Sequence, residues 1–332
     1  MRLVKILDFG FEKWVISAIM VPSEIDGTNV CFFYFTTADG TTIRCARWYP
    51  EMIQPCGSVV LLGGRKEFIE KYIETVSDLN QRGFEVFSFD WRGQGLSSRV
   101  LPNRLKGFVR NYHDYINDIE EFFQRFVLPE AMRPIYVLAH SMGGHVVLRY
   151  LHRQPAGIDK AVLVAPMLDI STKPFPKWIV RGLTWIGQSI GASEFIVPGS
   201  GKRTNFDQPF EGNMLTADPQ RFSVGINAVA QNPDLVLGGV TFAWLAATLE
   251  SIAYINRQGY LESIQTPVLM VAAAIDQVVS AAAQKSACRR LPNCCMLIIP
   301  NAHHEILMET DTIRSQFWNA FDSFIESKNT PA

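Results

Sequence analysis

The feature that most constrains the fold is an alternation of short apolar runs with longer amphipathic runs. Apolar runs of this kind are typical of strands buried on both faces, and the runs between them have the helical spacing of apolar residues. Strands are predicted at 59–62, 85–89, 135–138, 161–164, 268–271 and 296–299, and helices at 68–81, 112–126, 143–153 and 310–327. The pattern predicts an α/β fold with a mostly parallel central sheet and helices on both faces.

Two segments depart from this alternation. The aromatic and β-branched runs at 30–35 and 43–49 flank the turn Ala38-Asp39-Gly40 and predict an antiparallel hairpin. A later segment is rich in prolines and aromatic residues but lacks short strand-like runs, which favours a mainly helical insertion lying over the sheet. We therefore expect a core of residues 1–166 and 258–332, with its N-terminal hairpin at about 30–49, and a helical cap of residues 167–257.

Composition favours a folded intracellular protein without a nucleic-acid partner. Hydrophobic residues make up 48% of the 332 residues, enough for a sizeable core. The 31 lysines and arginines balance 32 acidic residues, so no basic surface for nucleic acid is expected. The apolar run 14–21 is short for a membrane span and lacks a signal-peptide cleavage pattern. We expect a cytoplasmic location; peripheral contact with the inner face of the membrane and the oligomeric state stay open.

The six cysteines do not have the spacing of a metal site. None forms a CxxC pair or a metal-like Cys/His pattern, and two of them are adjacent. Buried or free thiols in a reducing compartment are the expected state. The cysteines are Cys31, Cys45, Cys56, Cys288, Cys294 and Cys295.

The stretch AHSMGG at 139–144 directly follows the predicted strand 135–138. It is close to the pattern G-x-S-x-G, with Ala139 in the first glycine position. A sharp turn from strand to helix exposes a serine hydroxyl and forces small neighbours, because bulky side chains would collide there. The alternative is an ordinary helix start with Ser141 as its N-cap. We favour Ser141 as a nucleophile.

A serine hydroxyl needs a base, and the base needs an acidic partner. The adjacent His303 and His304 follow a predicted strand, and sequence physics alone does not choose between them. Asp276 follows the predicted strand 268–271 and is the candidate acid; its alternative role is a helix cap. The order of serine, aspartate and histidine along the chain is the one expected for this arrangement.

The developing oxyanion needs backbone amides as donors. The residue after the nucleophile, Met142, is expected to supply one. The second is expected from Arg65, in the loop Gly63-Gly64-Arg65 that follows the predicted strand 59–62. The Arg65 side chain is also a candidate contact for an anionic head group; the alternative is a glycine turn with a surface arginine.

These residues carry a resemblance to a known family. The chain resembles the α/β-hydrolase superfamily, in the branch of lysophospholipase L2 and the monoacylglycerol lipases, from about residue 40 to the C-terminus. The Gly-Arg loop is closer to lysophospholipase L2. The matching stretches are GRKEFIEKY at 64–72, DWRGQGLSSR at 90–99, AHSMGG at 139–144, NPDLVLGGVTFAW at 232–244 and HEILME at 304–309.

The resemblance implies the remaining roles in the site. It implies Ser141, Asp276 and His304 as the catalytic triad, His304 being the histidine before Glu-Ile-Leu, and the Arg65 and Met142 amides as oxyanion donors. It implies no metal and no organic cofactor. The aromatic side chains of the cap are candidate contacts for an acyl chain; the alternative is that they form the cap's own core. With Arg65, the candidate substrate-binding residues are Trp178, Trp185, Phe242 and Trp244.

The implied activity is hydrolysis of the carboxylic ester of a single-chain lipid. A lysophospholipase is the leading hypothesis. A monoacylglycerol lipase or a general carboxylesterase is the alternative within the same class. A non-catalytic ligand-binding protein on a hydrolase fold is the alternative of another class, because a fold by itself does not fix a function.

Overall fold

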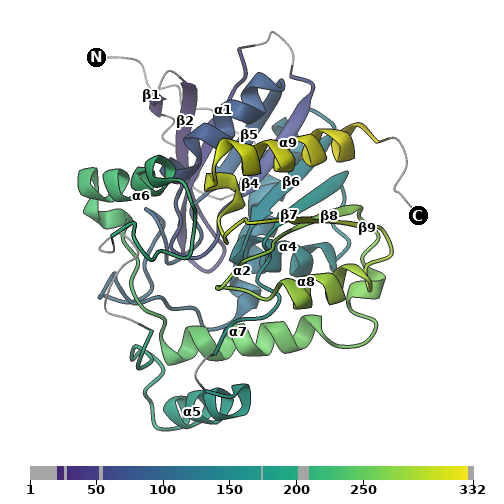
Figure 1. The fold of residues 1–332 in the computed structure, drawn as a ribbon. Helices are drawn as coiled ribbons and strands as arrows, with labels where there is room; N and C mark the ends of the chain where they lie inside the picture. The colour runs from purple at the N-terminus through teal and green to yellow at the C-terminus, as the bar shows by residue number, and fades with distance from the viewer. Residues whose placement is uncertain (1–20, 26–27, 52–54, 173–174, 201–208, 328–332) are drawn as a thin grey trace.

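A computed structural model describes residues 21–25, 28–51, 55–172, 175–200 and 209–327. Within these residues, nine strands form one sheet in the order β1-β2-β3-β5-β4-β6-β7-β8-β9, and Figure 1 shows helices on both sides of it. The strands are β1 (Val21–Ile25), β2 (Thr28–Thr36), β3 (Thr42–Trp48), β4 (Gly57–Leu62), β5 (Phe84–Phe89), β6 (Ile135–His140), β7 (Lys160–Val164), β8 (Val268–Ala273) and β9 (Cys294–Ile299).

The predicted α/β class is confirmed, since every pairing from β5 through β4 to β9 is parallel. The predicted hairpin is β2 and β3, which pair antiparallel, and β3 joins them to β5. The helix expected at 112–126 ends at Phe122 and continues as a π-helical turn, Phe123–Val127. The α-helices are α1 (Ile73–Gln81), α2 (Tyr112–Phe122), α3 (Leu128–Glu130), α4 (Met142–Leu151), α5 (Lys177–Ser189), α6 (Pro219–Gln231), α7 (Phe242–Ile255), α8 (Ala281–Cys288) and α9 (Asp311–Glu326).

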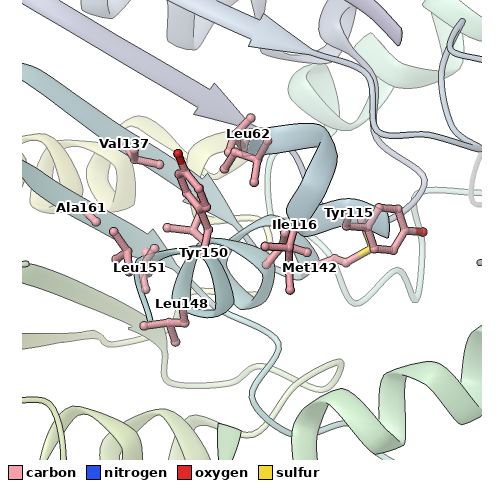
Figure 2. Packing of buried hydrophobic residues seen from close by; sticks show 14 of the residues in the cluster. Leu62, Tyr115, Ile116, Val137, Met142, Leu148, Tyr150, Leu151 and Ala161 are labelled. Atoms are coloured by element: carbon pink, nitrogen blue, oxygen red, sulfur yellow. The ribbon is translucent and has the colours of Figure 1, made fainter. Parts of the chain in front are cut away.

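The core lies on both faces of the sheet, because side chains alternate along each strand. In β4, Val60 and Leu62 belong to the apolar cluster that contains α2 and α4, whereas Val59 and Leu61 belong to the cluster with α1 and α9. Figure 2 shows the first cluster around α4, with Leu148 and other α4 side chains packed near the strands. Since α4 is buried along its whole length, its first residue is held firmly at the edge of the sheet.

The chain between β7 and β8 carries α5, α6 and α7. In its described residues it adds no strand to the sheet, and α7 packs against α2 and α5 (Figure 1). A bridge between Ile170 and Val279 nevertheless ties its first residues to the core. The division of the domains at 167 and 257 therefore stays a prediction. Within the described ranges, no helix combines the length and the apolar character that crossing a membrane requires.

One expectation about the cysteines is wrong. Cys288 and Cys294 form a disulfide between the end of α8 and the start of β9. The turn between these elements brings their Cα atoms to 5.4 Å, within the range of disulfides, although the spacing resembles no common motif. Cys31, Cys45, Cys56 and Cys295 are free thiols. The cysteines therefore give no support for a reducing compartment.

Candidate active site

Ser141 occupies a tight turn between β6 and α4. Its backbone has φ 49° and ψ −114°, a strained conformation for a residue with a side chain. A methyl group at Gly143 would lie 2.5 Å from the carbonyl oxygen of Gly63, and one at Gly144 would lie 2.9 Å from Cβ of Pro166. The two glycines thus allow neighbouring backbone to approach closely, and the predicted strand-to-helix turn is confirmed.

Three segments that are far apart in the sequence meet beside this turn. Ser141 follows β6, Asp276 follows β8 and His304 follows β9, so all three lie at the carboxyl edge of the parallel sheet. The Ser141 hydroxyl lies 2.9 Å from Nε2 of His304, and Nδ1 of His304 lies 2.7 Å from Oδ2 of Asp276. The side chains form one hydrogen-bonded chain from hydroxyl to imidazole to carboxylate.

The Asp276 carboxylate is anchored through both oxygens. Oδ2 accepts from His304, and Oδ1 accepts from the backbone amides of Val278 and Val279 at 2.8 and 2.9 Å. Burial alone would raise the pKa of this carboxyl, but its contacts with His304 and the two amides hold the pKa below the usual value. Asp276 therefore stays ionised and accepts from Nδ1 of His304, which leaves Nε2 as the acceptor for the Ser141 hydroxyl.

His303 has a different set of contacts. Its Nδ1 lies 2.9 Å from Oε1 of Glu309, and its backbone amide donates to the same oxygen at 2.8 Å. The ring is therefore bound to a carboxylate of the following segment, while His304 contacts Ser141. Geometry thus distinguishes the two histidines that sequence physics alone left equivalent.

The loop after β4 lies against the serine turn. A methyl group at Gly64 would lie 3.0 Å from Cβ of Ser141, so only a glycine allows this approach. In the described part of the chain, no acceptor is found for the backbone amide of Arg65 or for that of Met142, the first residue of α4. Two unused donors next to a serine hydroxyl are what an oxyanion site requires.

The groups around the Arg65 amide are held by side chains from the core. One of these contacts comes from the 64–72 stretch, and two come from the DWRGQG stretch at 90–95. The indole of Trp91 donates to the Gly63 carbonyl at 2.8 Å, the Gly64 amide donates to the Glu67 carboxylate, and the Lys66 amide donates to Oε1 of Gln94 at 2.7 Å. The DWRGQG stretch therefore shapes the loop that carries Arg65.

Beneath this loop lies a buried charged cluster that sequence reasoning missed. The Glu67 carboxylate contacts Lys71 Nζ at 2.8 Å, the Tyr72 hydroxyl at 2.5 Å and His140 Nδ1 at 2.9 Å. Lys71 also pairs with Glu305 at 2.6 Å, next to His304 in the chain. Burial would raise the pKa of Glu67, but His140 and Lys71 hold the pKa well below its usual value. The i, i+4 spacing of Glu67 and Lys71 was the available signal.

His140 connects the two loops of the site. Its Nδ1 faces the Glu67 carboxylate, and its Nε2 lies 3.2 Å from the backbone carbonyl of His304. Both partners are acceptors, so both ring nitrogens must carry protons to satisfy them. Burial lowers the pKa of His140, but Glu67 more than offsets that and raises the pKa above the usual value. His140 is therefore held as an imidazolium between the loop of Glu67 and the loop of His304.

Replacing Glu67 by glutamine is expected to lower the free energy of unfolding by about 3–5 kcal/mol, because it leaves two buried cations without their shared carboxylate. Urea unfolding measures this change. The matched control is Glu262→Gln, which removes an exposed ion pair with Arg290 and is expected to change stability little. Equal unfolding midpoints for the two variants would contradict the role given to the buried cluster.

The four aromatic side chains that were predicted to bind substrate lie in three different places. Trp244 lies beside the site, with its ring centroid 5.0 Å from Cζ of Arg65. Phe242 packs where α5 meets α7, next to Gly187. Trp178 and Trp185 lie on α5 with 74% and 70% of their surface exposed, and among the described residues neither contacts the site. The structure therefore brings one of the four aromatic side chains to Arg65.

Comparison with known proteins agrees with this arrangement. Residues 53–311 match the Hydrolase_4 family, described as serine aminopeptidase, S33. Lysophospholipase L2 of Escherichia coli (strain K12) is 31% identical over 306 residues, covering 90% of this chain and 88% of that protein. Monoglyceride lipase of Saccharomyces cerevisiae is 34% identical over 127 residues, covering 38% of this chain and 36% of its own. A crystal structure of a soluble variant of that yeast lipase, in complex with a substrate analog, aligns with a TM-score of 0.71 at 20% identity, over 92% of this chain and 98% of that chain.

The doubly covered parallel sheet and the serine turn at its carboxyl edge define an α/β hydrolase. This fold is confirmed by the structural match. The chain belongs to the Hydrolase_4 family, which its match over most of its length shows. It is a carboxylic ester hydrolase, so the predicted enzyme class is confirmed.

Proposed function

We propose that the protein hydrolyses carboxylic esters of single-chain lipids, with lysophospholipids as the preferred substrates, through an acyl-enzyme on Ser141. The observation that carries the proposal is the hydrogen-bonded chain from Ser141 through His304 to Asp276. The amides of Arg65 and Met142, which have no acceptor within the described ranges, supply the complementary donors. Together they form the constellation that acyl transfer requires.

Each group has one role in the proposed reaction. The Ser141 hydroxyl attacks the ester carbonyl while Nε2 of His304 takes its proton, and the two amides stabilise the oxyanion. The intermediate collapses as His304 returns the proton to the departing alcohol oxygen, which leaves the acyl group on Ser141. Water, deprotonated by His304, then releases the fatty acid and restores the serine. Asp276 stabilises the imidazolium in both halves of the reaction.

The preference for a phospholipid head group has two supports. A relative that matches over most of this chain is named lysophospholipase L2. In addition, a small cavity of about 20 Å³ beside the Arg65 loop is lined by the cations Arg65, Lys66, Lys71 and Arg221 and by the carboxylates Glu67 and Glu305. A phosphate needs more room than this, so binding there requires movement of the lining side chains.

A substrate panel tests the proposal. With the acyl chain held constant, fatty acid release from lysophosphatidylcholine is expected to exceed release from monoacylglycerol. Faster monoacylglycerol hydrolysis would favour a monoacylglycerol lipase, and activity on short esters alone would favour a general carboxylesterase. An aminoacyl p-nitroanilide belongs in the panel because the family description names an aminopeptidase; turnover of that compound alone would contradict the proposal.

Several finer expectations stay predictions. They are contact of the acyl chain with Trp178, Trp185, Phe242 and Trp244, the cytoplasmic location, and peripheral contact with a membrane. The exposed apolar side chains of α5 are compatible with the last of these, since tryptophan is enriched where proteins meet lipid head groups.

A further inference from the structure

The Arg65 side chain reaches from the oxyanion loop to the segment that precedes and begins α7. Its Nη2 donates to the backbone carbonyl of Gly238 at 2.7 Å, and its guanidinium lies over the ring of Trp244. Both partners belong to the predicted cap. Arg65, whose backbone amide is a proposed oxyanion donor, therefore also binds another part of the fold through its side chain.

The place occupied by the guanidinium is built from glycines. The core segment 105–107 pairs with the cap segment 238–241, because the Gly107 amide donates to Gly239 and the Gly238 amide donates to Leu105, both at 2.8 Å. A methyl group at Gly107 would lie 2.5 Å from Nη2 of Arg65 and 3.1 Å from the carbonyl oxygen of Gly239. The absence of a side chain at this position is what leaves room for the guanidinium.

The Arg65 guanidinium forms no ion pair with a carboxylate of the described residues. Burial lowers the pKa of this group to about 10, so it stays charged at neutral pH. Its Nε has no hydrogen-bond partner among the described residues. A half-buried cation held by one carbonyl and a ring face is not a stabilising ion pair. A positioning role explains this set of contacts.

The consequence concerns the direction of one amide. The groups on both sides of the Arg65 amide are fixed to the core through Glu67 and Gln94. We propose that the Arg65 guanidinium is a positioning group. Its contacts with the 238–244 segment fix the direction in which the Arg65 backbone amide points toward the oxyanion. This inference rests on the proposed function, because it assigns that amide to the oxyanion site. It also gives a role to the Gly238 carbonyl, which accepts from the guanidinium.

Two substitutions test the coupling without altering the amide itself. Arg65→Met keeps the backbone and side-chain length but removes the guanidinium, and Gly107→Ala introduces the methyl group that collides with it. The Gly107 backbone lies outside the left-handed region, so alanine is conformationally allowed there. The matched control is Gly182→Ala in α5, where an added methyl meets no atom within 4 Å.

The measurement is kcat and KM for p-nitrophenyl butyrate, an ester without a phosphate. Each single variant is expected to lower kcat by about 10- to 100-fold with little change in KM, since a misdirected oxyanion donor weakens the transition state. The double variant is expected to be no slower than the slower single variant, because a methyl at Gly107 then has no guanidinium to displace. The inference would be overturned if the kcat losses of the two single variants multiply in the double variant. It would also be overturned if Arg65→Met loses activity only on lysophospholipid.

Thermal unfolding of the native protein, the two single variants and the double variant separates this inference from the proposed function. Non-additive shifts in Tm are expected because the two sites share one contact. A native protein that fails to turn over the ester while showing this coupling would end the proposed function and leave the contact standing. Additive Tm shifts together with additive losses of kcat would end the coupling alone.

Discussion

Replacing Ser141 by alanine is expected to lower kcat for a p-nitrophenyl ester by about 10⁶-fold, because removing the nucleophile of a triad leaves only binding and the oxyanion donors. The geometry that supports this is the 2.9 Å approach of the hydroxyl to Nε2 of His304. The measurement is initial-rate turnover of the purified variant against the native protein.

The control for this substitution is Ser315→Ala. Ser315 is exposed on α9, so its loss should leave turnover unchanged. A Ser141→Ala protein that folds normally and retains near-native turnover would show that the reaction does not use this hydroxyl.

Replacing His304 by alanine is expected to have an effect of the same size, about 10⁶-fold in kcat, because serine and histidine act as a unit. The double variant with Ser141→Ala should be no slower than either single variant. A product of the two losses would mean that the residues contribute independently and would contradict their direct contact.

The neighbouring histidine provides a matched control. His303 contacts Glu309 instead of the serine, so His303→Ala should retain most of the activity. The contrary pattern, with His303→Ala inactive and His304→Ala active, would exchange their roles and refute the assignment of the base.

The sequence predicted the framework well because the strands are buried on both faces. The runs 59–62, 135–138 and 161–164 each became strands of the parallel sheet, and the serine turn followed from small residues after one of them. Such features are local, since they depend on the spacing of apolar residues and on steric limits at a turn. The helix α8 was missed because its alanine-rich sequence has little amphipathic pattern.

The parts of the site that escaped prediction depend on contacts between distant segments. Glu67 and His140 are 73 residues apart, and nothing in either local sequence shows that the carboxylate meets the imidazole. The bond of the Arg65 side chain to a carbonyl 173 residues away is likewise not visible in the local sequence. The Cys288–Cys294 disulfide likewise depends on the turn between α8 and β9.

The most direct test of the account is labelling of the native protein with a fluorophosphonate, followed by mass spectrometry of its peptides. A single adduct on Ser141 is predicted, with labelling strongly reduced in the His304→Ala variant because the hydroxyl then has no base. An unlabelled native protein, or an adduct on another residue while Ser141 stays unmodified, would contradict the claim that Ser141 is the nucleophile.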